Sequence, residues 1–183
     1  MDSSKRGPFT IKGTREIYSN PWIHVSEDSV ERPDGSTGIF GIVDIIPGVT
    51  IVAMDEKNNV LLSHEFRYAV NRVSIELISG GMEAGEDPLD CAKRELEEEA
   101  GVIAEKWVSL GCLDPFTSVI RSPNWMFLAR GFHEGKTASD SSEILSIERV
   151  PFSEVLQMVM DGKISHGASS VAVLKVSRYL GLS

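Results

Sequence analysis

The sequence predicts an α/β (α+β) fold in which a mixed β-sheet is sandwiched between helices. Three observations lead to this expectation. Stretches rich in valine and isoleucine follow one another, a helical pattern with a clear start and stop interrupts them, and two more helical stretches end the chain. This order of strands, helix, strands and helices is typical of a sheet with helices packed on it.

Strands are predicted where β-branched and other apolar residues run together. Residues 9–30 are mixed, and only 22–25 are compatible with a short strand there. The polar segment 55–59 has the composition of a turn. The other expected strands are 40–46, 49–54, 60–64, 73–78, 104–113, 125–131 and 144–150.

The first helix has a start and a stop signal. Asp87 can cap free backbone N–H groups, and Pro88 fits the first helical position. Gly101 then ends the pattern, which predicts a helix of about 13 residues, close to the mean for globular proteins. Two later helices are expected near 152–160 and 169–180.

A chain of 183 residues with 42% hydrophobic content can bury one sizeable core. We expect a small N-terminal extension, residues 1–39, and one main domain, residues 40–183. The first 12 residues are polar, and no apolar run approaches the length of about 18 residues that a membrane span needs. We therefore expect a cytoplasmic protein with no membrane partner.

Charge is distributed unevenly along this acidic chain, whose net charge is −9. A nucleic-acid partner is not expected, because such surfaces are normally basic. Eight carboxylates lie between Glu83 and Glu99, against only Lys93 and Arg94, while apolar residues recur there at helical spacing. Like charges crowded on one helix need a cation to offset them, and a divalent metal is the natural candidate.

The chemistry is concentrated in the segment GGMEAGEDPLDCAKRELEEEAGV. Glu95, Glu98 and Glu99 stand at positions i, i+3 and i+4, so their carboxylates project from one helix face. Hard oxygen ligands of this kind select Mg²⁺ or Mn²⁺. We assign Glu95 and Glu99 as principal metal ligands, and Glu98 as an auxiliary ligand or local base.

The residues around these glutamates have supporting roles in this interpretation. Arg94 can reach Glu98 at i+4 and orient its carboxylate during catalysis. Gly80 and Gly81 are expected to let the backbone turn tightly before the helix. A backbone carbonyl there, that of Ser79, is expected to complete the metal shell.

The same segment resembles the Nudix box, GX5EX7REUXEEXGU with U aliphatic, at every specified position. A chance match at a given start has a probability on the order of 10⁻⁹ at average residue usage. The resemblance implies the Nudix fold and metal-dependent hydrolysis of a diphosphate, with this loop and helix holding the metal.

Two further segments, HEFRYAVNRVSIELISGGMEAGE and GKISHGASSVAVLKVSRYL, are similar to the ADP-ribose pyrophosphatase branch of that family. We expect substrate contacts from Arg67, Glu76, Gly80 and Met82. The fork of the Arg67 guanidinium suits a diphosphate. The alternative for Arg67 is an ion pair with Glu65 or Glu76.

The branch also implies a homodimer, in which N-terminal strands of one subunit reach over the other's site and adenine stacks on an aromatic ring. Trp22 is our first choice for that ring, although Trp22, Tyr68 and Trp125 are each compatible with core positions. Structural or surface roles are expected for the four histidines, which show no ligand spacing.

Two loops depart from the branch pattern. Asp114-Pro115-Phe116 replaces the usual Ser-Pro-Gly in a loop that contacts the second sugar in relatives, which favours a wider range of substrates. The later loop, ASDSSEIL, keeps one acid, Glu143, as general base or ligand of a third metal, with Asp140 as a substitute. Either acid could equally be an exposed loop carboxylate.

The predicted reaction is hydrolysis of the diphosphate bond of ADP-ribose or a related nucleoside diphosphate sugar, giving a nucleoside monophosphate and a sugar phosphate. One alternative is a Nudix hydrolase of another class, acting on GDP-mannose, a dinucleoside polyphosphate or a nucleoside triphosphate. The other is a regulator that senses nucleotides without turning them over.

Overall fold

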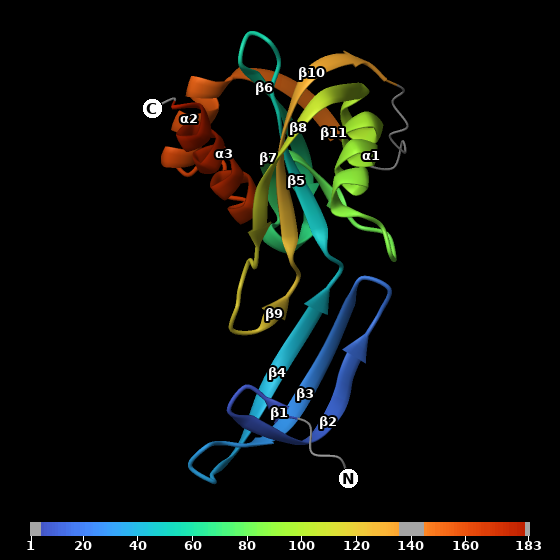
Figure 1. Ribbon diagram of the computed structural model, residues 1–183, viewed down its shortest axis with the longest axis vertical. Coiled ribbons are helices and arrows are strands. Elements are labelled where there is room, and N and C mark those ends of the chain that lie inside the picture. Colours follow the sequence, from blue (N-terminus) through green and yellow to red (C-terminus); the bar gives the residue numbers. More distant parts are fainter. Residues whose placement is uncertain (1–4, 136–144, 182–183) are drawn as a thin grey trace. The chain divides into compact units, whose positions relative to one another are not determined.

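The computed structural model describes residues 5–135 and 145–181, which form two compact units (Figure 1). The first unit contains the chain up to Ile46 together with Asp114–Pro123. The second contains Pro47–Leu113 and the chain from Asn124 onward. The loop predicted to face the second sugar therefore belongs to the first unit.

The first unit is a five-stranded sheet with the order β1-β2-β3-β4-β9. Neighbouring strands in this sheet are antiparallel, except that β4 and β9 run parallel. The expected short strand at 22–25 corresponds to the start of a longer one that begins at Ile23, and a second long strand precedes it. The bounds are β1 Lys5–Arg6, β2 Phe9–Ser19, β3 Ile23–Glu31, β4 Thr37–Ile45 and β9 Ile120–Arg121.

The second unit contains a six-stranded sheet with the order β11-β6-β7-β5-β10-β8. Strands β5 and β10 run parallel and the other neighbours antiparallel, so the sheet is mixed as predicted. A short 3-10 helix, η1 (Tyr68–Val70), joins β6 to β7. The bounds are β5 Gly48–Ala53, β6 Asn59–Arg67, β7 Arg72–Gly81, β8 Val102–Leu113, β10 Asn124–Glu134 and β11 Leu145–Pro151.

Helices cover both faces of this sheet, which confirms the predicted sandwich (Figure 1). Leu96 of α1 (Pro88–Ala100) packs in a core with Ile51 and Ile78. On the other face, α2 (Phe152–Met160) and α3 (Gly167–Leu180) pack against a second core that contains Leu77. None of the helices in the described ranges combines the length and apolar character that crossing a membrane requires.

Helix α1 begins and ends where its capping residues predict. The Asp87 carboxylate accepts a hydrogen bond of 2.9 Å from the Leu89 N–H. Gly101 has φ 63°, a left-handed conformation that favours glycine, and its N–H bonds to the Glu97 carbonyl. The 13 residues between them carry the glutamates of the motif.

The N-terminus of α3 lies where β5 and β7 stop pairing. These strands are paired only from Gly48 and Gly81 to Ile51 and Ile78. The N–H of Leu77, the next residue of β7, donates instead to the buried Ser169 hydroxyl of α3 at 3.0 Å. A helix side chain thus replaces the missing strand partner.

Candidate active site

Two glutamates of α1 share one cationic nitrogen. Nη1 of Arg94 lies 2.7 Å from Glu95 Oε1 and 3.1 Å from Glu98 Oε2. Glu95 is 9% exposed, whereas Glu98 and Glu99 are half-buried. The helical spacing therefore brings at least two carboxylates around a common positive atom.

The three guanidinium nitrogens of Arg94 all donate hydrogen bonds, including a long one of 3.4 Å to Cys91 Sγ. The predicted contact with Glu98 is confirmed, and the guanidinium also binds Glu86 at 2.9 and 3.1 Å and the Gly81 carbonyl at 3.1 Å. Glu86 is a specified position of the motif to which the sequence assigned no role. Seven residues separate it from Arg94, so only the fold of the loop reveals their contact.

Burial and hydrogen bonding move the pKa values of these carboxyls in opposite directions. Burial raises the pKa of Glu95, although Arg94 partly opposes this. Hydrogen bonds from Arg94 and from the Glu83 N–H lower the pKa of Glu86 to about 2. Glu86 therefore stays anionic and binds the guanidinium, while burial makes a neighbouring positive charge favourable for ionised Glu95.

Gly80 does not make the tight turn expected of it. Gly80 and Gly81 are the last residues of β7, and the chain turns at Gly85, where φ is +81°. A Cβ on Gly80 would overlap the carboxyl group of Glu95. The glycine is needed because the metal-binding candidate of α1 occupies the space of a side chain.

The oxygen-rich donor set fits a divalent cation. Within residues 5–135 and 145–181, no three His, Cys, Asp or Glu side chains converge in a metal-binding arrangement. Instead the Arg94 nitrogen stands between two of the predicted ligands and offsets their charge. Ser79 pairs with Thr50 in the sheet beside Gly80, and the metal-binding role of its carbonyl stays a prediction.

Arg67 and Glu76 form a salt bridge next to this helix. Arg67 donates to Glu76 from Nε at 3.2 Å and from Nη2 at 2.8 Å, and to Glu65 from Nη1 at 2.9 Å. Both ion pairs that the sequence offered as the alternative are present. The negative charge of Glu99 contributes to the raised pKa of Arg67, which brings the guanidinium into the field of the α1 glutamates.

The remaining predicted residues are placed as follows. Met82 is half-buried, packs against the core below α1, and donates its N–H to the Pro47 carbonyl at 2.8 Å. Among the aromatic candidates, Trp125 packs against the same core, whereas Tyr68 is 92% exposed and Trp22, in the first unit, is 67% exposed.

Glu143 and Asp140 lie outside the described residues. Their candidate roles as general base or metal ligand stay predictions.

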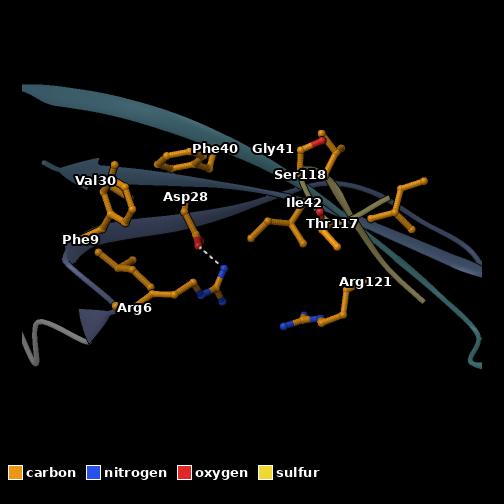
Figure 2. Close-up of a pocket in the computed structure, with 14 residues that line it drawn as sticks. Arg6, Phe9, Asp28, Val30, Phe40, Gly41, Ile42, Thr117, Ser118 and Arg121 are labelled. Carbon is orange, nitrogen blue, oxygen red and sulfur yellow. Dashed lines mark hydrogen bonds and ion pairs between the residues drawn. The ribbon is translucent and has the colours of Figure 1, made fainter. Parts of the chain in front are cut away.

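A hollow of about 440 Å³ lies in the first unit (Figure 2). Apolar side chains of β2, β3 and β4 line it, together with Arg6 and Arg121. Arg6 pairs with Asp28 at 3.0 Å and Arg121 pairs with Asp44, so both positive charges are already compensated. The chemistry of α1, rather than this hollow, marks the candidate active site.

The low pKa of Glu86 predicts how a Glu86→Gln variant responds to pH. A carboxyl whose pKa falls from 4.5 to about 2 on folding contributes stability above pH 4.5 and loses it as the pH falls toward 2. Because the pair is partly solvated, we expect Glu86→Gln to be less stable at pH 7 by about 1 kcal/mol.

Urea unfolding of wild type and variant between pH 7 and pH 3 measures this difference. It should be constant down to about pH 4.5 and shrink below that. A difference that grows on acidification would contradict the assigned direction.

The sequence matches two family models. Residues 44–168 match the NUDIX domain, and residues 9–43 match the nucleoside diphosphate sugar hydrolase N-terminal domain. The chain is 31% identical to an ADP-ribose pyrophosphatase of Mycobacterium tuberculosis over 171 residues, which is 92% of this chain and 83% of that one. It is 28% identical to a methanol dehydrogenase activator of Bacillus methanolicus over 172 residues, 90% and 89% of the two chains.

A solved structure described as an ADP compounds hydrolase has the same fold. It superposes with a TM-score of 0.85 at 20% identity and covers 98% of this chain and 97% of its own. Together with the domain match, which spans more than half of the sequence and includes α1 and its glutamates, the likeness leads to one conclusion: the chain belongs to the Nudix family.

Proposed function

We propose that this protein hydrolyses the diphosphate bond of ADP-ribose or related nucleoside diphosphate sugars, releasing a nucleoside monophosphate and a sugar phosphate. The observation that carries the proposal is the complete glutamate face of α1, where Glu95 and Glu98 surround one positive charge. The N-terminal match to nucleoside diphosphate sugar hydrolases supports the substrate class.

Side chains of the second unit have distinct roles in this reaction. Glu95, Glu98 and Glu99 hold Mg²⁺ or Mn²⁺, with the Ser79 carbonyl as a further ligand. The bound cation neutralises diphosphate oxygens and acidifies water. Arg94 keeps two of the carboxylates in place through its hydrogen bonds.

Substrate binding and proton transfer use other groups. Three of the five N–H groups of Arg67 donate to Glu65 and Glu76, and we propose that its other N–H groups bind the diphosphate. Glu98 or Glu143 accepts the proton of the attacking water.

The range of accepted sugars follows from the loop at 114–123. This loop belongs to the first unit, where Ile120 and Arg121 pair with β4. We propose that its Asp114-Pro115-Phe116 sequence widens the range of accepted sugars beyond ADP-ribose.

The decisive experiment is a substrate panel assayed with Mg²⁺ and with Mn²⁺. It contains ADP-ribose, GDP-mannose, UDP-glucose, diadenosine polyphosphates and nucleoside triphosphates. We expect AMP and ribose 5-phosphate from ADP-ribose, with other nucleotide sugars also cleaved. Cleavage of the triphosphates or dinucleoside polyphosphates alone would overturn the proposal.

Glu95→Gln provides the matched test of the catalytic helix, with Glu97→Gln on the same helix as its control. The kcat of Glu95→Gln should fall at least a hundredfold, which corresponds to about 2.7 kcal/mol of transition-state stabilisation. The kcat of Glu97→Gln should stay close to the wild-type value. Equal activity of both variants would remove Glu95 from the site.

Gly80→Ala should lower activity strongly while changing the stability of the fold only slightly. The added methyl must displace the Glu95 carboxyl, which is the flexible end of a side chain, so we expect the unfolding free energy to change by less than about 1 kcal/mol. Activity should fall by about a hundredfold, because the carboxylate leaves its place.

Gly13→Ala is the control, since nothing lies within 4 Å of a Cβ there. Steady-state kinetics and urea unfolding measure both variants. Full activity of Gly80→Ala would show that the position of Glu95 is unimportant.

We also propose that residues 1–39 form a dimerisation extension to the catalytic domain, residues 40–183. Large apolar side chains are exposed in the first unit, among them Ile17, Trp22 and Ile39, and such surfaces mark interaction sites. Trp22 is then available as a platform for adenine. Sedimentation equilibrium should give about twice the chain mass, and a monomer at micromolar concentration would contradict this.

A further inference from the structure

His166 lies directly before the first residue of α3 and faces a buried carboxylate. Its Nδ1 is 3.4 Å from Oε2 of Glu76 and 2.9 Å from the Ser169 hydroxyl. The side chain of Glu76 is only 6% exposed. A carboxylate this well buried requires partners, because removing its charge from water is costly.

Two side chains, Arg67 and His166, contact the same oxygen of Glu76, Oε2. Oε2 accepts a hydrogen bond from Arg67 Nη2 at 2.8 Å and faces His166 Nδ1, while Oε1 accepts from Arg67 Nε. The contact of Nδ1 with Glu76 at 3.4 Å is electrostatic, and its hydrogen bond is with the Ser169 hydroxyl at 2.9 Å. We assign the proton to Nδ1, because a hydrogen there faces two oxygen acceptors. Burial lowers the pKa of His166, which keeps the ring neutral at neutral pH.

The gap between β5 and β7 makes this contact possible. Leu77 packs in the core below α2 and α3, and Ile78 packs in the core below α1. Side chains alternate along a strand, so Glu76 belongs to the same face as Ile78, the face of α1. His166 reaches it because the start of α3, anchored by Ser169 to the Leu77 N–H, fills the place of a strand.

We propose that His166 is a positioning residue for Arg67, acting through Glu76. The imidazole restrains the carboxylate through its 3.4 Å contact, and the carboxylate fixes the guanidinium by two hydrogen bonds. Arg67 is thereby prepared for a diphosphate before substrate arrives. The link to substrate rests on the proposed function, whereas the link from His166 to Arg67 does not.

The experiment compares wild type with His166→Ala and His166→Asn, using His133→Asn, an exposed histidine of β10, as the control. Its first readout needs no substrate: solvent exchange of the Arg67 Nε–H, followed by NMR and assigned with Arg67→Lys. Exchange should be about tenfold faster in His166→Ala. It should return toward wild type in His166→Asn, because an amide N–H can replace the Nδ1–H.

Arg94 supplies an internal reference, because its Nε–H also binds a carboxylate. Unchanged exchange at Arg67 in His166→Ala would overturn the proposal. So would an acceleration shared by Arg94, which would reveal general loosening of the fold.

The second readout is kinetic and uses the best substrate of the panel. His166→Ala should lower kcat/KM by about tenfold, mainly by raising KM, and His166→Asn should retain most of the wild-type value. A fall in kcat at constant KM would overturn positioning of a binding group. If wild type cleaves nothing on the panel, the proposed function fails, and exchange at Arg67 still decides the role of His166.

Discussion

The candidate active site depends on one guanidinium. Arg94 uses all three guanidinium nitrogens to join the loop carboxylate Glu86, the end of β7 and two glutamates of α1. Like-charged side chains at i and i+3 repel, so Glu95 and Glu98 can lie together only around a positive charge. Arg94 thus holds the acidic face of α1 together with the loop and the end of β7.

The same logic extends through the second unit. A buried anion at each step is matched by a cation or a hydrogen-bond donor: Glu95 by Arg94, and Glu76 by Arg67 and His166. Arg67 is the last residue of β6, and His166 directly precedes α3. Both contact Glu76, because β5 and β7 stop pairing there and the start of α3 lies beside β7. Charge pairing, and not apolar packing alone, determines the positions of these candidate site residues.

The sequence predicted most where local signals and burial agree. Helix α1 was predicted from its caps, and β5 from an apolar run that is buried throughout. Strand β2 could not be predicted, because most of it is exposed and no hydrophobic alternation marks it. The role of Gly80 was missed for a different reason: a glycine signals a turn from sequence alone, whereas here it makes room for a carboxyl 15 positions later.

The start of α3 takes the place of a strand beside β7, and this affects how the protein can associate with other chains. An open strand edge offers unpaired N–H groups to any other chain, which is how edge-to-edge association begins. In this protein the Ser169 hydroxyl accepts a hydrogen bond from such a group, the Leu77 N–H of β7, so the start of α3 occupies a position at which another chain could otherwise pair. Removal of α3, residues 167–180, would uncover this N–H of β7 and with it a place where another chain could pair with the strand.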